Sequence, residues 1–407
     1  MTTTVLAIFA LVYLGMLLGG LPYLQLDRTG VALLGAIALV AVGALTPTQA
    51  AESVHLPTLL LLFSFMVISA QMRLGGFYGR VTLAIADARL SPPALLAVLV
   101  VAVGALSAVF SNDVICLAVA PVLADACLAR RLDPVPYLLG LACAANVGSA
   151  ATLIGNPQNM LIGQTLGLAF GGYFLEAIVP VAAGLAVTWG VIAWQMRGRW
   201  RTVLDDPPPE RREEFATYDR WQTLKGLAVV GALLGVFLLT DIPREVAALA
   251  GAGVLLMSRR MHSRKMLGLV DWELLVLFIG LFVVNEALAH SGLAAEALAR
   301  LAHAGVTLAD RGTMLAATFV LSNLVSNVPA VMLLLPAATE PWSGPLLALV
   351  STLAGNFLLV GSIANLIVVD SARRRGVAID WRLHARTGVP VALATLLVTA
   401  IWFTLLA

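Results

Sequence analysis

Polar, helix-breaking residues occur twice, at matching positions, in a chain that is otherwise apolar enough to lie in lipid. Ser111-Asn112 recurs 215 positions later as Ser326-Asn327. Gly155-Asn156-Pro157-Gln158-Asn159 has its counterpart 206 positions later, in Gly361-Ser362-Ile363-Ala364-Asn365. The chain is 60% hydrophobic and only 12% charged, whereas soluble globular domains are about one-quarter charged. The sequence therefore predicts a membrane protein built as two repeats, whose paired breaks mark a solute-binding site.

The apolar runs predict an all-α polytopic fold of two inverted repeats, each with five transmembrane helices and one re-entrant hairpin. The predicted segments are a first repeat at 1–196 with a hairpin at 92–128 and a broken helix at 136–167, a cytoplasmic linker at 197–221, and a second repeat at 222–407 with a hairpin at 312–338 and a broken helix at 345–369. Each hairpin contains the Ser-Asn break, and about eleven apolar residues follow that break. We expect the helix after it to be about 16 Å long, half of a bilayer core.

Basic residues are distributed unevenly between the two sides of this topology. With an external N-terminus, only Arg244, Arg300 and Arg311 of the 25 lysines and arginines fall outside. This bias matches the positive-inside rule. The sequence therefore predicts a multi-pass protein of a bacterial cytoplasmic (inner) membrane with both termini outside and no cleaved signal peptide.

Backbone that leaves helical geometry inside lipid must be satisfied by protein or by a water-filled cavity. Half-helix N-termini offer free N–H groups to an anion, and the carbonyls that end the preceding half-helices suit a cation. We expect Asn112, Asn327 and Asn156 each to cap the helix that follows it. No lysine or arginine lies deep in a span, so an anionic solute would depend on helix dipoles, amides and co-bound cations.

These considerations define the candidate site. The predicted solute-binding residues are Ser111, Asn112, Asn156, Gln158, Asn159, Ser326, Asn327, Ser362 and Asn365. The predicted cation- or proton-coupling residues are Asp113, Thr152, Gly155, Gly361 and Glu286. The expected sodium positions are Ser111, Asn112 and Gly155 in one half, and Ser326, Asn327 and Gly361 in the other. No cofactor other than a coupling Na⁺ or H⁺ is expected.

Two of the ionisable candidates are special. Asp113 lies on the first hairpin tip, where the second half carries Val328, and a carboxylate at the bilayer midplane is a functional candidate because it is costly. Glu286 precedes His290 by one helical turn, and we expect the two to form a pair near the membrane face.

Several motifs resemble those of the ion transporter superfamily, which includes arsenite permeases, citrate transporters and divalent anion/sodium symporters. The matching motifs are Ser111-Asn112-Asp113, residues 152–159, Ser326-Asn327-Val328-Pro329, and Gly355-Asn356 through Asn365. The resemblance covers nearly the whole chain and is nearest to the anion-permease and arsenite-permease branches. It implies substrate and cation sites at hairpin tips and broken helices, elevator-like alternating access, and a homodimer.

The leading hypothesis is a secondary transporter that moves a small inorganic or carboxylate anion, or an oxyanion, across the lipid bilayer, coupled to sodium or protons. Efflux of arsenite or antimonite as neutral hydroxides is one alternative, and sodium/proton antiport through Asp113 is another. A water channel is disfavoured because Asn156-Pro157 is the sole Asn-Pro pair. We expect no enzyme, since neither His-Glu-x-x-His nor Gly-x-Ser-x-Gly occurs, and no nucleic-acid partner.

Overall fold

The computed structural model describes residues 1–21, 24–200, 218–303 and 305–405, and these are almost entirely helical. The exception is a short antiparallel pair, β1 (Gly20–Leu21) and β2 (Leu26–Asp27), between the first two helices. Within the described residues, seven helices are long and apolar enough to cross a membrane, and several shorter apolar helices accompany them. The all-α polytopic fold is thus confirmed, while most of the predicted linker 197–221 lies outside the described residues.

The two halves contain the same helices in the same order. The first half comprises α1 (Thr2–Leu18), α2 (Arg28–Ala41), α3 (Pro47–Glu52), α4 (Leu56–Leu74), α5 (Phe77–Ala86), α6 (Pro92–Val109), α7 (Asn112–Ala129), α8 (Pro134–Ser149), α9 (Pro157–Thr165) and α10 (Phe170–Gln195). The second half comprises α11 (Arg220–Leu239), α12 (Arg244–Leu256), α13 (Ser263–Leu267), α14 (Trp272–His290), α15 (Leu293–His303), α16 (Arg311–Val325), α17 (Asn327–Leu334), α18 (Ser343–Ala354), α19 (Ile363–Arg373) and α20 (Trp381–Leu405), with 3₁₀ turns η1 (Leu335–Ala337) and η2 (Leu359–Gly361). Each helix therefore has its counterpart ten labels later.

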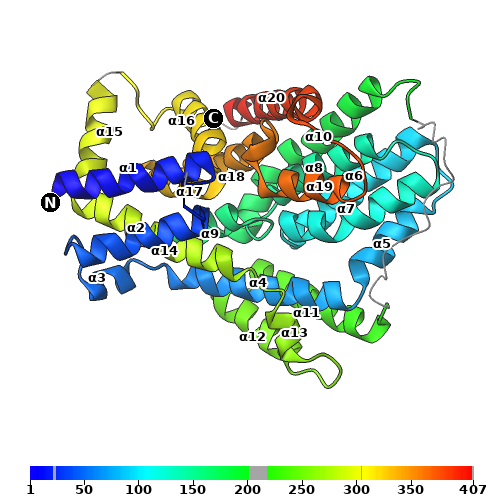
Figure 1. Ribbon diagram of the computed structural model, residues 1–407, viewed down its shortest axis with the longest axis horizontal. Helices are drawn as coiled ribbons and strands as arrows, with labels where there is room; N and C mark the ends of the chain where they lie inside the picture. The colour runs from blue at the N-terminus through cyan, green and yellow to red at the C-terminus, as the bar shows by residue number, and fades with distance from the viewer. Residues whose placement is uncertain (22–23, 201–217, 304, 406–407) are drawn as a thin grey trace.

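Equivalent helices of the two halves exchange partners. α2 packs along α14, and in the equivalent place α12 packs along α4 (Figure 1). Beyond the breaks, α7 packs on α19 and α17 packs on α9. This reciprocal packing is what an inverted repeat produces, and it makes the interior a joint product of both halves.

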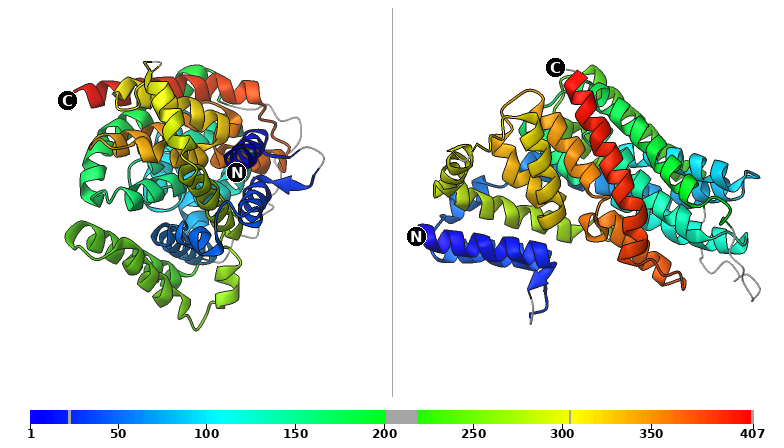
Figure 2. Two further views of the ribbon diagram at one scale, coloured as in Figure 1. Left: turned by 90° about the vertical axis from the view of Figure 1, so that its left-hand side faces the viewer. Right: turned by 90° about the horizontal axis from the view of Figure 1, so that it is seen from above.

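α8 and α18, the helices that end at the two broken-helix segments, form the centre of the molecule. Every residue of α18 is buried, as are nearly all residues of α8. Helices that are apolar all round belong in such an interior. α6 covers α8, α16 covers α18, and α10 lies against α20 on the outside (Figure 2). The four breaks consequently meet near the middle of the molecule (Figure 1).

The first hairpin differs from its predicted dimensions. α7 has 18 residues, about 27 Å at 1.5 Å per residue, so the expected length of about 16 Å was wrong for this helix. The helix continues past Asp125 because Arg375, just beyond α19, pairs with that carboxylate at 2.9 Å, with both side chains largely buried. In the second hairpin, residues 327–337 form the short apolar helix that the sequence predicts.

Two glycines bring the first hairpin onto the central helix. A Cβ added at Gly148 of α8 would lie 2.3 Å from the Cα and the carbonyl oxygen of Gly104 in α6. Backbone atoms cannot yield as the end of a flexible side chain can. Contacts between small residues are a main way in which membrane helices approach closely. The contact between Gly104 and Gly148 holds α6, which leads to the hairpin tip, against the end of α8, where the first broken helix is interrupted.

We expect Gly148→Ala to lower the free energy of unfolding by about 1–3 kcal/mol, because overpacking must separate α6 from α8. Gly190 in α10 is the matched control, since a Cβ there meets no atom within 4 Å. Gly190→Ala should be neutral or stabilise the helix by up to about 1 kcal/mol. Denaturant titration of both variants in mild detergent provides the comparison. Equal stability of the two variants would refute the close contact.

Candidate solute and ion site

The first broken helix is held open by Asn156. α8 ends at Ser149 and α9 begins at Pro157, and the Asn156 side chain accepts the backbone N–H of Asn159 at 2.9 Å. The asparagine cap followed by proline is therefore present as the sequence predicts. Gly155 must be glycine, because a Cβ there would lie 2.2 Å from the Ser149 carbonyl oxygen.

The hairpin tips use their asparagines differently from the prediction. Ser111 and Ser326 occupy the N-cap positions, and neither makes a side-chain cap bond. Asn112 and Asn327 are the first helical residues, so the expectation that they cap α7 and α17 was wrong. The reason at the first tip is that the Asn112 amide turns inward and donates to Asn146 Oδ1 at 3.0 Å.

The first tip is also bonded directly to the first break. The Asn112 backbone N–H donates to the Gly155 carbonyl at 3.2 Å. The Thr152 hydroxyl donates to the carbonyl of Ala108, near the end of α6. Asn112, Thr152 and Gly155, which come from separate segments of the first half, therefore lie together. Asn112 and Gly155 belong to the same expected sodium position, and Thr152 is one of the predicted coupling residues.

Asn146, in the middle of α8, joins the two halves. Its Nδ2 donates to Asn356 Oδ1 at 2.8 Å and to Asn365 Oδ1 at 3.2 Å, while its Oδ1 accepts from Ser362 Oγ at 2.9 Å. All four side chains are buried. Asn146 thus binds the second broken helix with every polar atom of its side chain and also receives the Asn112 amide.

Thr352, in α18, makes the reciprocal contacts with the first broken helix. Its Oγ1 accepts from Asn156 Nδ2 at 3.1 Å and from Gln158 Nε2 at 3.2 Å, and it donates to Asn159 Oδ1 at 3.3 Å. Thr352 follows Asn146 by 206 positions, the same offset that relates the two breaks. We refer to these joined residues, Asn112, Asn146, Asn156, Gln158, Asn159, Thr352, Asn356, Ser362 and Asn365, as the amide cluster.

The exposed carbonyls of the breaks are held in the same symmetrical way. Asn159 Nδ2 donates to the Thr152 carbonyl at 3.0 Å, and Asn365 Nδ2 donates to the equivalent Leu358 carbonyl at 3.3 Å. The carbonyl just beyond α8, at Ala150, accepts from Tyr173 Oη at 2.6 Å. Asn356 is the position equivalent to Ala150, and its carbonyl lies 3.1 Å from His384 Nε2.

Some buried oxygens around the hairpin tips have no hydrogen-bond partner among the described residues. They are Asn112 Oδ1, Asn323 Oδ1, Asn327 Oδ1, Ser107 Oγ and Ser322 Oγ. Asn323 and Asn327 lie against the second break, close to Gly361 and Gly355 respectively. Because an unpaired buried acceptor is costly, amide oxygens here suit a cation or the O–H group of a solute. Oxygen atoms of this kind are the ligands that hard cations prefer.

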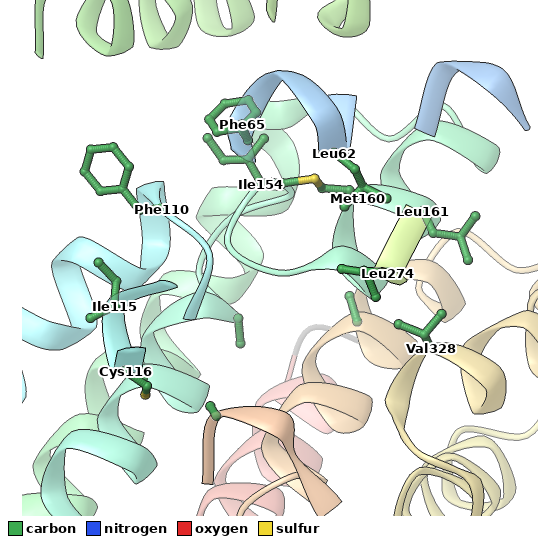
Figure 3. Close-up of a cluster of buried hydrophobic side chains, with 14 of the residues drawn as sticks. Leu62, Phe65, Phe110, Ile115, Cys116, Ile154, Met160, Leu161, Leu274 and Val328 are labelled. Atoms are coloured by element: carbon green, nitrogen blue, oxygen red, sulfur yellow. The ribbon is translucent and has the colours of Figure 1, made fainter. Parts of the chain in front are cut away.

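The two hairpin tips differ at their third residue. Asp113 is half-buried and lies within electrostatic range of Asp271, the residue that caps α14 of the other half. Its counterpart Val328 is buried and lies near Leu274 of α14 (Figure 3). The first tip therefore has a charged neighbour, Asp271, from the opposite repeat, whereas the second tip lies near an apolar residue of its own repeat.

Glu286 is not among the residues that the breaks bring together. It is exposed and lines a separate cavity of about 180 Å³ with Gln49, Glu52 and His290. Within the described part of the chain, no ion pair joins Glu286 to His290. The expected pair is therefore not formed, although both side chains line the same cavity.

Sequence reasoning missed the residues at the centre of the cluster. Asn146 and Thr352 lie inside continuous apolar helices, so no break drew attention to them. Tyr173 and His384 each occupy the fourth position of α10 and α20, outside either motif. The 206-residue offset between Asn146 and Thr352 was the available signal, although the residue types differ.

Comparison with known proteins gives consistent matches over most of the chain. The citrate transporter family matches residues 5–345. The silicon efflux transporter LSI3 of Oryza sativa subsp. japonica is 29% identical over 93% of this chain and 92% of its own length. An uncharacterized transporter of Mycobacterium tuberculosis is 28% identical, covering 84% of each chain. The crystal structure of the Alcanivorax borkumensis YdaH transporter shares the fold, with a TM-score of 0.59 at 16% identity over 99% of this chain and 98% of that one.

Proposed function

The chain belongs to the citrate transporter family, and on that premise we propose that it is a secondary active transporter for a small inorganic oxyacid. The solute is carried as an oxyanion or as its neutral hydroxide. Its family and its fold make it a multi-pass membrane transporter. The solute, the coupling ion and the mechanism are the proposal. Its single strongest support is the amide cluster, in which a side chain from each half bonds to the break of the other half.

The polar groups of the cluster favour an uncharged or hydroxyl-bearing solute. No lysine or arginine contacts the cluster within the described residues, and its amide N–H groups already donate to protein oxygens. The unpaired atoms beside it are acceptor oxygens. Such oxygens receive O–H groups, as in arsenious, antimonious or silicic acid, and coordinate a cation. LSI3 is named as a silicon efflux transporter, which is consistent with this solute class.

An elevator-like movement fits the way the site is assembled. The cluster is built from α7–α9 in the first half and from α18, α19 and the break between them in the second, with the carbonyl contacts of α10 and α20 at its edge. The α4–α12 pair packs against α9 and the α2–α14 pair packs against α17, but neither pair contributes a residue to the cluster. We propose that the cluster moves as one unit against these two helix pairs, in a homodimer with both termini outside the inner membrane.

Coupling is assigned to Asp113. This carboxylate is near Asp271, so binding of a sodium ion or a proton would relieve their mutual repulsion. The second tip has Val328 in the same place, which leaves one charged coupling site per chain. If no solute were needed, the same carboxylate would serve sodium/proton antiport, which is the second candidate function.

The solute assignment is tested by flux into proteoliposomes. We expect saturable, gradient-dependent flux of arsenite, antimonite or silicic acid. A fall in flux as rising pH ionises the acid would identify the neutral hydroxide as the transported form, and a rise would identify the oxyanion. Thr352→Val should reduce that flux at least tenfold, because it removes the hydroxyl that Asn156 and Gln158 share. Thr395→Val is the matched control, since the Thr395 hydroxyl bonds only to carbonyls of its own helix. Flux restricted to citrate, or linear in solute concentration, would contradict the proposal.

The coupling assignment is tested by Asp113→Asn. We expect the neutral amide to abolish the dependence of flux on a sodium or proton gradient, while downhill exchange of solute continues. Asp241→Asn, in the exposed loop before α12, should leave coupling unchanged. Glu286→Gln should also leave it unchanged, given the position of Glu286 outside the cluster. A coupling ratio that survives in Asp113→Asn would remove this residue from the mechanism.

A further inference from the structure

A large polar cavity lies beyond the amide cluster and shares no residue with it. It has a volume of about 460 Å³ and lies among the ends of α4 and α5, the middle of α7 and the C-terminal part of α19. Its lining includes Arg73, Leu117, Pro121, Ser371, Arg374 and Arg375. Leu117 follows Asn112 by five residues, so the cavity begins about 8 Å along α7 from the cluster.

Positive charge predominates on the cavity wall. Three arginines line it, against a single carboxylate, that of Asp370. Asp370 is already paired with Arg374 at 2.8 Å, and the nearby Asp125 is paired with Arg375 at 2.9 Å. Within the described residues, Arg73 has neither an ion pair nor a side-chain hydrogen bond. The local field therefore favours an anion.

A second group in the cavity also lacks a partner. Ser371 Oγ is buried and has no hydrogen-bond partner among the described residues. A buried hydroxyl without a partner is uncommon in folded proteins. It lies on α19 beside the paired Asp370, across the cavity from α4 and α5, so it supplies a hydroxyl donor where the arginines supply charge.

We propose that this cavity binds an anion bearing a phosphate-type group, held between Arg73 of α4 and the Ser371 and Arg374 groups of α19. Arginine matches the geometry of tetrahedral oxyanions through its planar set of N–H donors. The volume leaves room for whatever the group is attached to. The ligand is therefore either a free phosphate-class ion or the headgroup phosphate of an anionic lipid.

Such a ligand would join the two repeats at a point close to the amide cluster. Arg73 belongs to the first repeat, whereas α19 belongs to the second, is capped by Ser362 of the cluster and carries Asn365 in its first turn. Binding would consequently restrain α19 relative to α4. The proposal does not depend on which solute the cluster carries, because none of the cavity residues bonds to the cluster side chains.

Binding of inorganic phosphate to the purified full chain tests the site. Titration calorimetry in mild detergent, at constant ionic strength with chloride as the replaced anion, should give saturable binding that weakens at least tenfold in Arg73→Gln and severalfold in Ser371→Ala. Arg80→Gln is the matched control, since Arg80 is an exposed arginine of α5 that does not line the cavity. Thr352→Val should bind phosphate normally, which separates this site from the cluster.

The source of the phosphate group is resolved in lipid nanodiscs. Weaker phosphate binding in phosphatidylglycerol than in phosphatidylcholine, with no such difference in Arg73→Gln, would assign the site to lipid headgroups. Equal binding in both lipids would assign it to a free ion. The proposal is overturned if the unsubstituted protein shows no saturable binding in detergent or in either lipid, or if Arg73→Gln binds as tightly as Arg80→Gln does.

Discussion

The structure depends on the rule that polar backbone and side-chain groups inside lipid must find partners within the protein. Each broken helix exposes carbonyls and N–H groups that its own half satisfies only in part. Asn146 and Thr352 complete the set by reaching across to the opposite break. The inverted arrangement of the repeats is what brings each of them to the other half, so fold and site have the same physical origin.

The cluster is only approximately symmetric. The equivalent positions that carry different residues show where the two halves differ in chemistry. Asn146 uses two polar side-chain atoms where Thr352 uses one, although each bonds to three residues of the opposite break. Tyr173 holds one carbonyl where His384 holds the other. Asp113 lies within electrostatic range of Asp271, while Val328 lies near Leu274. A transporter that binds one solute with one coupling ion has use for such inequality, because identical half-sites would bind identical ligands.

The sequence pattern predicted the features that depend on residues close together in the chain. The repeats, the hairpins, the breaks and the Asn156 cap followed from apolar run lengths, the 206 and 215 offsets and the Asn-Pro dipeptide. Contacts between distant residues were not predictable. α7 extends past Asp125, whose partner Arg375 lies 250 residues further along the chain. The Asn112 side chain bonds to Asn146 instead of capping α7. Glu286 was a coupling candidate because it is ionisable within an apolar segment, but only packing reveals that its side chain is exposed and lies outside the cluster.

The claim that the two breaks form one site is tested most directly by a double-mutant cycle between halves. Asn146→Ala, Ser362→Ala and the combined variant are compared through their free energies of unfolding in mild detergent. The account predicts a coupling energy of about 1 kcal/mol or more, as found for residues of one hydrogen-bond network. Additive effects, within about 0.3–0.5 kcal/mol, would mean that the halves do not share this site.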